Sequence, residues 1–506
     1  MPSTKKHIVI IGGGIGGLAT AILLAKQGRD VSLYEQLDDL GGKARQFTVD
    51  GFRFDMGPSW YLMPKVFEHF YTLIGEDIHK HIKLTRLSPA YKVFFEKNHP
   101  IIISGNLTQD AKTFDAVEPG AGKKLEKYIQ KAGTTYHTAI DSFLYTNFNA
   151  VHKFVQPQIL KSGPFMARVA TQSIDSYVSS YFQDNRLKQI MEYPMVFLGA
   201  SPYNAPALYH LMSYMDFEEG VFYPEGGIYS VIESLIKIAK KYGVKLHTNK
   251  PVNRIIVEDG KATGIELSNT VIPADIVISN ADLHFTETRL LPTQYQSYPE
   301  GYWQKRTAGP SALLFYMGIK GSLPQLEHHN LYFSDDWHKN FTDIFDNKTW
   351  PRPASMYICK PSATDTSVAP KNHENVFILV PLPAKDMTKS EQNTLTKQYF
   401  NQFKQLINEP GLDKRIVYQK TYSPRDFTTD YNAWEGSALG LSHTLKQSAL
   451  FRPRNKSKKV KNLYYVGGNT IPGVGLPMCL ISAELIVKHL SHDKTITPLG
   501  TLPEIK

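Results

Sequence analysis

The sequence predicts an α/β fold, because three stretches each combine an apolar strand and an apolar or amphipathic helix with a glycine-rich turn. These stretches run from Ile8 to Glu35, from Val221 to Asp282 and from Tyr464 to Leu485. Their strands are apolar at successive positions, which is typical of a parallel sheet buried on both faces. Because 506 residues exceed one ordinary core, we expect two or three lobes.

Composition and charge narrow the class of protein. Apolar residues make up 42% of the chain and charged residues 21%, which is a globular balance. Two cysteines, Cys359 and Cys479, exclude a disulfide framework and suit the reducing cytoplasm. The net charge of +10 favours an anionic membrane surface over nucleic acid, because the chain has no arginine-rich run. Its clearest basic cluster, Arg452 to Lys461, is equally compatible with a solvated loop.

The segment from His7 to Ala25 resembles a membrane anchor because it contains no Asp, Glu, Lys or Arg. Five glycines in its middle oppose that interpretation, since glycine weakens a helix. No small-residue cleavage site follows the segment, so a signal peptide is not indicated either. We therefore expect no transmembrane span in this chain.

A strand, a glycine turn, a helix and a second strand follow one another at the N-terminus. Gly12 permits a tight turn, Gly14 lets the backbone approach a pyrophosphate, and Gly17 allows close packing of helix and strand; Gly16 belongs to the same turn. The helix N-terminus offers unpaired N–H groups to phosphates. Glu35 ends the second strand, where a carboxylate accepts hydrogen bonds from ribose hydroxyls. This order predicts a dinucleotide site.

The residues after Glu35 favour FAD over a nicotinamide cofactor. Instead of another β–α–β unit, the chain continues with the glycine-basic loop Leu40 to Ala44 and a short hairpin that ends in Gly57, Pro58 and Ser59. The loop resembles the second flavin motif of the amine oxidase and carotenoid desaturase superfamily. That resemblance places Gly42, Lys43, Gly57, Pro58 and Ser59 at the cofactor, with Lys43 reaching the FAD phosphates where the family usually has arginine.

The middle block predicts a helix after Gly226-Gly227, strands near 244–249 and 274–282, and a hairpin that turns at Asp259-Gly260. By resemblance to the same superfamily, this block rejoins the nucleotide domain. The backbone of Val252 then contacts the adenine end, and Asn280 also belongs to the cofactor site.

Other segments indicate a lipophilic site. The stretches "ALLFYMGIKG" and "NVFILVPLPA" read as strands that could form the floor beneath an apolar substrate, or as ordinary core strands. In Met191 to Phe217 three prolines prevent a continuous helix, and the aromatic and methionine side chains suit an apolar tunnel, a membrane surface or plain core.

Several motifs in order extend the resemblance over most of the chain, which is similar to bacterial-type phytoene desaturases with an amine-oxidase-like FAD fold. These motifs are "VIIGGGIGGLATAILLAKQG", "YPEGG", "LLFYMGIKGSLPQLEHHNLYF", "PSATDTSVAP", "TLKQSALFRPRN" and "LYYVGGNTIPGVGLP". The resemblance implies a Rossmann-like FAD-binding domain in the parts 1–85, 221–300 and 426–506. A mixed-sheet substrate domain occupies 86–140 and 301–425, and a helical membrane-proximal lobe occupies 141–220.

The family implies that FAD takes a hydride from a carotene, that a trans double bond forms, and that a quinone or oxygen reoxidises the flavin. Phytoene, converted to neurosporene or lycopene, is the leading substrate. The alternatives are desaturation of a C30 or hydroxylated carotenoid, oxidation to terminal aldehydes, amine oxidation, and a non-catalytic carotenoid carrier. The chain is expected to dock peripherally on a cytoplasmic membrane surface and not to bind nucleic acid.

The remaining reactive residues yield no further site. His328-His329 lacks companions with metal-ligand spacing, so no metal is expected. Cys479 is interpreted as a small buried hydrophobe, and no catalytic base can be named. The tail after His492 is expected to be loosely held.

The closing stretch, from Leu463 to Leu485, predicts that the chain returns to its first, nucleotide-binding domain. Leu463 to Val466 reads as the last strand of the FAD sheet. Gly467 and Gly468 let the backbone pass close to the cofactor. Gly475, Leu476, Pro477 and Met478 open a final helix whose N–H groups face the flavin ring and stabilise negative charge on it.

Overall fold

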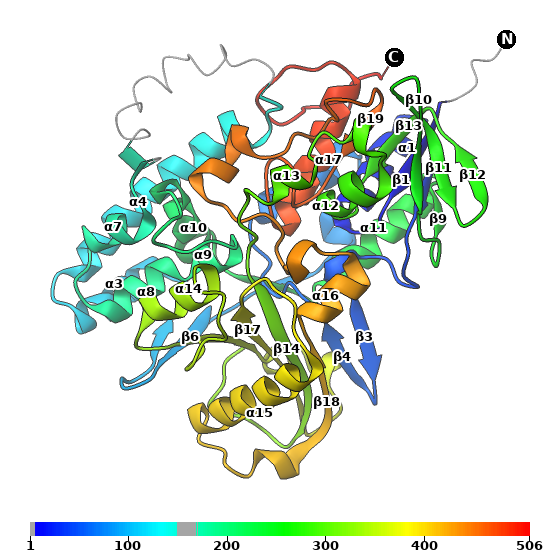
Figure 1. Cartoon of the computed structure of the whole chain (residues 1–506). Coiled ribbons are helices and arrows are strands. Elements are labelled where there is room, and N and C mark those ends of the chain that lie inside the picture. The colour runs from blue at the N-terminus through cyan, green and yellow to red at the C-terminus, as the bar shows by residue number, and fades with distance from the viewer. Residues whose placement is uncertain (1–5, 149–167, 170, 506) are drawn as a thin grey trace.

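The computed structural model describes residues 6–148, 168–169 and 171–505 (Figure 1). Its first sheet is parallel and has the strand order β19-β13-β1-β2-β9. The strands are β1 (His7–Ile11), β2 (Asp30–Tyr34), β9 (Lys245–His247), β13 (Ile276–Ser279) and β19 (Leu463–Tyr465). The sheet therefore collects strands from all three glycine-rich stretches, including the predicted last strand near the C-terminus.

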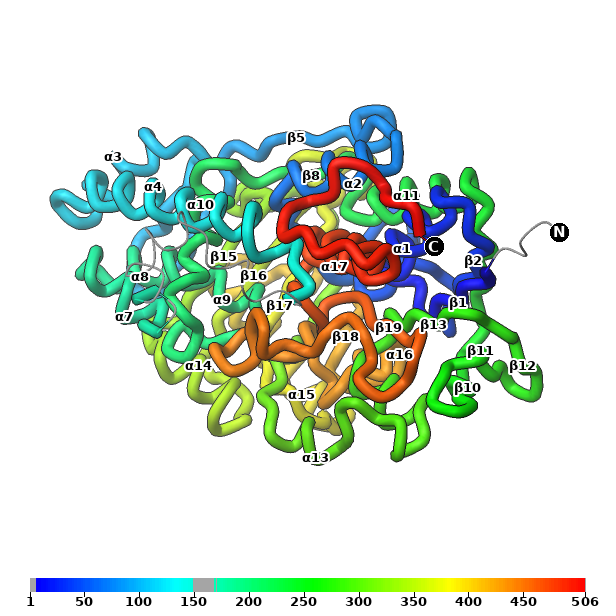
Figure 2. Tube along the Cα trace, turned by 90° about the horizontal axis from the view of Figure 1, so that it is seen from above, coloured from blue at the N-terminus to red at the C-terminus, as the bar shows by residue number. Residues whose placement is uncertain are grey.

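Residues of β1 alternate between two apolar cores, which places the sheet between two layers. Ile8 and Ile10 pack with the helices α1 (Ile15–Lys26), α11 (Tyr229–Lys241) and α17 (Leu476–Leu490). Val9 and Ile11 pack on the opposite face, towards the antiparallel sheet of β10 (Arg254–Glu258), β11 (Lys261–Leu267) and β12 (Thr270–Pro273). Figure 2 shows α17 beside α1, although the two helices lie at opposite ends of the sequence.

The segment with an anchor-like composition is thus a buried strand followed by a helix of 12 residues. No helix within the described residues has the length and apolarity that a membrane crossing requires.

A second, mixed sheet has the order β18-β14-β17-β16-β15-β6-β7, with β15 and β6 parallel and the other neighbours antiparallel. The strands are β6 (Tyr91–Phe95), β7 (Ile101–Ile103), β14 (Ser311–Lys320), β15 (His329–Phe333), β16 (Met356–Cys359), β17 (His373–Leu382) and β18 (Ile416–Tyr422). Helix α15 (Lys389–Leu406) covers one face, packing on side chains such as Phe315 and Ile378. On the other face, Leu314 and Tyr316 belong to the core that surrounds the cavity described below.

Shorter elements connect the two sheets. The predicted hairpin after Lys43 is formed by β3 (Gln46–Val49) and β4 (Phe52–Asp55), and β5 (Leu84–Arg86) pairs with β8 (Phe222–Pro224). The short helices among them are α2 (Pro64–Leu73), α12 (Leu283–Phe285), α13 (Glu300–Trp303), α14 (Trp337–Phe345) and α16 (Pro424–Tyr431).

Helices dominate the region between β7 and β8, which includes the predicted lobe 141–220. The described helices are α3 (Leu107–Val117), α4 (Ala121–Ala139), α7 (Ile174–Ser179), α8 (Asn185–Glu192), α9 (Pro194–Phe197) and α10 (Leu211–Tyr214). The predicted break at the prolines is confirmed, because α8 ends before Pro194 and α9 begins at it. Residues 149–167 and 170 of this lobe lie outside the described residues.

The expectation of a loose tail after His492 is wrong. Ile496 and Leu499 are buried, and the Leu499 N–H donates to Glu484 Oε1 at 2.6 Å. The fully buried Lys488 ammonium donates to the Thr495 carbonyl at 3.3 Å and to the Thr497 carbonyl. A buried ammonium needs such acceptors, and the tail supplies them by folding back beside α17 (Figure 2).

Candidate active site

A cavity of about 950 Å³ extends from the end of the parallel sheet to the uncovered face of the mixed sheet. All the residues predicted for the cofactor line it, except Gly17. The lining predicted residues are Gly12, Gly14, Gly16, Glu35, Gly42, Lys43, Gly57, Pro58, Ser59, Val252, Asn280, Gly467, Gly468, Gly475, Leu476, Pro477 and Met478. The structure therefore brings together groups separated by more than 400 positions in sequence.

The turn between β1 and α1 requires glycine for local reasons. Gly12 has a φ of +95°, and a Cβ at Gly17 would clash with the Gly12 carbonyl oxygen. Gly17 therefore faces the strand and not the cavity, as expected for a packing position. Gly14 caps α1 without a side chain, and the first turn holds no acidic residue. The N–H groups at this helix end are suited to a pyrophosphate.

Asn280, directly after β13, fills the space between the glycine-rich segments. Its Nδ2 donates to the Gly12 carbonyl at 3.3 Å. A Cβ at Gly14 would lie 2.9 Å from Asn280 Nδ2, and a Cβ at Gly16 or Gly467 would lie 2.7 or 2.8 Å from Asn280 Oδ1. Glycine at these three positions thus lets one asparagine contact both the first and the last segment of the domain.

Glu35 stands at the end of β2 with its carboxylate held by backbone. Its Oε2 accepts the Gly13 N–H at 2.6 Å, and its Oε1 accepts the Leu37 N–H at 2.9 Å. A carboxylate has about four acceptor positions, so roughly two remain for hydroxyl donors. The residue lines the cavity and fits the predicted ribose contact.

Lys43 also lines the cavity, and its ammonium contacts the C-terminal part of the chain. Nζ donates to the Ala438 carbonyl at 2.8 Å and the Ser437 carbonyl at 3.3 Å. Burial lowers the pKa of this ammonium. Two of its three donor positions are used in this way, and the predicted phosphate contact would take the third.

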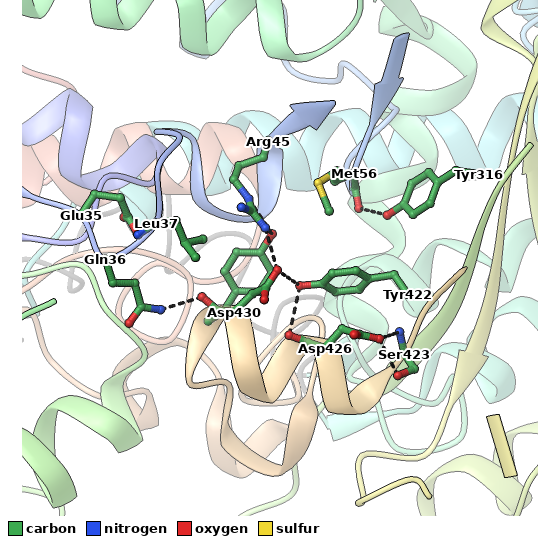
Figure 3. Close-up of polar contacts among 11 residues, drawn as sticks. Glu35, Gln36, Leu37, Arg45, Met56, Tyr316, Tyr422, Ser423, Asp426 and Asp430 are labelled. Carbon is green, nitrogen blue, oxygen red and sulfur yellow. Dashed lines mark hydrogen bonds and ion pairs between the residues drawn. The ribbon is translucent and has the colours of Figure 1, made fainter. Parts of the chain in front are cut away.

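Arg45, two positions beyond Lys43, supports the site without lining the cavity, and the sequence did not reveal this role. Its Nη2 pairs with Asp430 Oδ2 at 2.8 Å, and Tyr422 donates to the same oxygen at 2.9 Å (Figure 3). Gln36 Nε2 donates to the Asp430 carbonyl at 2.6 Å. These contacts fix α16 beneath the loop after β2, and Asp430 itself lines the cavity.

The closing stretch runs from β19 to α17 and is held from behind by Arg452. Gly467 and Gly475 have φ values of +107° and +125°, and Gly475 caps α17 without a side chain. Arg452 donates to the carbonyls of Gly468 at 2.6 Å and Thr470 at 3.2 Å. The solvated-loop interpretation is therefore wrong for this arginine, which is 2% exposed and whose pKa burial lowers to about 10.

The part of the cavity formed by the mixed sheet and by residues 193–215 has an uncharged lining. None of the described lining residues from the mixed sheet or from residues 193–215 carries a charge. The lining residues of these two groups are Tyr193, Val196, Phe197, Leu198, Leu208, Tyr209, Leu211, Met212, Met215, Ser311, Ala312, Leu314, Leu331, Tyr332, Phe333, Met356, Tyr357, Leu379 and Pro381. The stretch Met191 to Phe217 supplies part of the cavity wall, and others of its side chains, such as Met191 and Phe217, pack in the adjoining apolar core.

His443 brings one imidazole to this wall. Its Nδ1 lies 2.8 Å from the Leu198 carbonyl, which can only accept, so Nδ1 carries the hydrogen and Nε2 keeps the lone pair. Nε2 faces the closing stretch, because a Cβ at Gly473 would clash with it. Burial and the neighbouring Arg452 hold the pKa of His443 well below 6.5, so the ring is neutral at ordinary pH.

Comparison with known proteins gives the class of the chain. The family model for flavin-containing amine oxidoreductases matches residues 15–489, so the chain belongs to that family. Solved structures share the fold: putrescine oxidase with putrescine bound has a TM-score of 0.59 at 12% identity, covering 96% of this chain and 98% of that one. Cyclohexylamine oxidase from Brevibacterium oxydans has a TM-score of 0.57 at 13% identity, covering 95% and 97%.

Curated relatives place the chain more narrowly. It is 41% identical to carotenoid 3,4-desaturase from Haloarcula japonica, over 96% of this chain and 98% of the relative. It is 34% identical to the zeta-carotene-forming phytoene desaturase from Myxococcus xanthus, over 96% and 94%. The chain is therefore a carotenoid desaturase, which is an FAD-dependent oxidoreductase. The cofactor cradle, formed by Gly12, Gly14, Gly16, Gly467 and Gly468, fits FAD together with Glu35 and the cavity.

The N-terminus of α17 offers a test of the cofactor site. We expect Gly475→Val to lower the FAD content of the purified protein, because valine at a φ of +125° distorts the helix start that lines the cavity. The measurement is the ratio of visible flavin absorbance to protein. Gly260→Val is the control, since Gly260 also has a positive φ but does not line the cavity. Equal FAD content in the two variants would contradict the assignment.

Proposed function

We propose that this carotenoid desaturase introduces trans double bonds into an acyclic carotene of the phytoene type, with neurosporene-like or lycopene-like products. The uncharged cavity that continues from the cofactor cradle carries this proposal, because a hydrocarbon offers no polar group to recognise. When bound, FAD supplies the acceptor for a hydride from the substrate. The family resemblance implies a quinone or oxygen as the final electron acceptor.

The walls of the cavity provide binding and orientation. Burial contributes about 0.8 kcal/mol for each CH₂ group, so a long polyene gains affinity from the length and shape of the cavity. Aromatic rings such as Trp60, Phe197 and Phe333 restrict the path of the chain. The same walls exclude water from the reacting carbons.

His443 is suited to accept the proton that leaves the carbon next to the site of hydride loss. Its Nε2 carries a lone pair and faces Gly473, and both residues line the cavity. Loss of a hydride leaves the substrate electron-deficient, so the neighbouring C–H is strongly acidic. A weakly basic, neutral imidazole is sufficient for such a proton.

A second candidate reaction is desaturation of the C3–C4 bond in a carotenoid that is already conjugated. The specific observation in its favour is the 41% identity to a relative named carotenoid 3,4-desaturase. The relatives reported above are named as desaturases, which favours double-bond formation over the alternative of terminal aldehydes.

Two bacterial hosts separate these reactions, one accumulating phytoene and the other lycopene. We expect the full chain to convert phytoene into products with more conjugated double bonds, detected by chromatography and absorption spectra. Conversion only in the lycopene host would establish the second candidate instead. If neither pigment changed while the chain retained FAD, both reactions would be rejected; cells with an empty vector are the control.

The proton acceptor is tested by His443→Asn, whose amide can keep the hydrogen bond to the Leu198 carbonyl but has no counterpart of Nε2. We expect flavin reduction by substrate, followed anaerobically in a single turnover, to slow by about 10²–10⁴-fold with FAD content unchanged. In the unmodified protein the rate should stay flat above pH 6.5 and fall only well below it, because the pKa of His443 is lowered. Wild-type reduction by the variant would exclude His443.

We propose that the protein takes its substrate from an anionic membrane surface through the segment Leu445–Phe451. Leu445, Leu450 and Phe451 are 46%, 54% and 58% exposed, although large apolar side chains are usually buried. Ala449, in the same segment, lines the cavity. Exposed basic residues lie within the segment, at Lys446, or follow it, namely Arg454, Lys456, Lys458, Lys459 and Lys461. Apolar insertion and attraction to anionic lipid thus act at one edge of the cavity.

Vesicle flotation tests this docking segment. We expect Leu450→Ser/Phe451→Ser to reduce co-flotation with anionic vesicles, because the apolar contribution is lost while the charge is unchanged. High salt should weaken binding of the unmodified chain by screening its basic residues. The control is Val271→Ser/Val417→Ser, which changes two side chains of similar exposure, 56% and 52%, on other elements. Equal flotation of both double variants would contradict the proposal.

A further inference from the structure

Three potential metal ligands meet behind the cavity wall. β15 and β16 are antiparallel neighbours, and their register places His329 opposite Cys359. His328 precedes β15 and completes the group. One nitrogen from each histidine and the Cys359 Sγ all lie within 4.8 Å of one another, and the three residues are buried. The sequence could not show Cys359 as a companion of the two histidines, because strand pairing brings it there.

Both imidazoles use Nδ1 for a hydrogen bond and leave Nε2 without one. His328 Nδ1 lies 2.7 Å from Thr364 Oγ1, and His329 Nδ1 lies 2.7 Å from the Tyr357 hydroxyl. The Nε2 atoms of both histidines are buried and have no hydrogen-bond partner. Metal-bound histidines commonly use one ring nitrogen for the metal and the other for an orienting hydrogen bond. Two buried, unsatisfied nitrogens in one cluster with a thiol are otherwise unusual.

Aromatic packing fixes the two rings in these positions. Trp60 stacks on His329 with ring centroids 4.4 Å apart and an interplanar angle of 11°. Tyr223 packs on His328 with centroids 4.7 Å apart, and the two imidazoles themselves are 4.5 Å apart. The potential ligands are therefore held in place before any ion arrives, which lowers the ordering cost of binding.

We propose that His328, His329 and Cys359 bind one zinc ion. Imidazole and thiolate are the donors that zinc prefers, whereas magnesium and calcium require oxygen ligands. Tetrahedral Zn–N and Zn–S bonds of about 2.0–2.3 Å place ligand atoms roughly 3.5 Å apart. From separations of up to 4.8 Å, the cluster has to contract by about 1.3 Å at most. Binding releases the Cys359 thiol proton to solvent, and no electron transfer is involved.

The surroundings compensate the charge that remains. A zinc ion with one thiolate and two neutral imidazoles carries a net charge of +1. The Asp55 carboxylate acts electrostatically on Cys359 and is held by the Ile228 N–H at 2.6 Å. Zinc usually has four ligands, so with three protein ligands one coordination position remains for water.

The zinc site would position part of the cavity wall. Tyr357 hydrogen-bonds both His329 and, at 2.7 Å, the Ser59 hydroxyl. Tyr357, Ser59 and Trp60 all line the cavity. The ion would thus hold this wall from behind, without contact to the substrate.

Metal analysis of the purified, FAD-containing full chain tests the proposal. We expect about one zinc per chain by mass spectrometry, and at least a tenfold lower content in Cys359→Ser. Cys479→Ser is the matched control, because Cys479 is the other cysteine of the sequence and lies outside the cluster. Equal zinc contents in the two variants, or copper or iron in place of zinc, would overturn the assignment.

A second measurement covers the case in which Cys359→Ser does not fold. The unmodified chain is stripped with a chelator and refilled with Co²⁺ alone. We expect about one equivalent to bind with a thiolate-to-cobalt charge-transfer band in the near ultraviolet, and zinc to displace it. An unmodified chain that contains no zinc and shows no such band would refute the site. Neither readout depends on carotenoid turnover, so the result is independent of the proposed function.

Discussion

The close approach of three glycine-rich segments at the carboxyl end of the parallel sheet is the constraint on which the site depends. Gly12 follows β1, Glu35 follows β2, Asn280 follows β13 and Gly467 follows β19. The carboxyl ends of parallel strands lie at the same edge of a sheet. The residues that follow these strands therefore converge at that edge and form a ligand site. Asn280 fits between the segments because its neighbours lack side chains. The mixed sheet and the helices then extend the resulting cavity away from this edge.

Local sequence patterns made the nucleotide-binding end of the site predictable. Contacts between segments that are distant in sequence could not be predicted. The order of strand, glycine turn and helix indicated β1, α1 and β2, and the same logic identified β19 and α17. Arg45 and Asp430 pair across 385 positions, and no pattern within either segment announces the partner. Arg452 was misread because it lies in a basic run, although its guanidinium is needed by backbone carbonyls of the closing stretch. The tail was misread because Lys488 gives no local sign of requiring its carbonyls.

The cavity stays apolar although several polar side chains form its wall. Tyr193 turns its hydroxyl to Asp216 Oδ2 at 2.9 Å, and Tyr209 turns its hydroxyl to Ser448 at 2.9 Å. Burial raises the pKa of Asp216 to about 7, and Tyr91 donates to the same oxygen at 2.7 Å. Each of these polar atoms finds its partner behind the wall, so the ring faces are left for the substrate. This arrangement reconciles tyrosine-rich walls with a hydrocarbon ligand.

One ring nitrogen of His443 has its partner behind the cavity wall, as the tyrosine hydroxyls do. The other ring nitrogen faces the closing stretch instead. Its Nδ1–H is used by the Leu198 carbonyl behind the wall, while Nε2 is turned towards Gly473 of the closing stretch. Arg452 supports this arrangement twice, since it holds the carbonyls of Gly468 and Thr470 and adds its positive charge to the burial that lowers the pKa of His443. A histidine with an ordinary pKa would be partly charged in mild acid and would bring a cation into an apolar cavity. Burial, with the charge of Arg452 as a second cause, therefore keeps the imidazole neutral, which suits both a hydrocarbon substrate and the removal of an acidic proton.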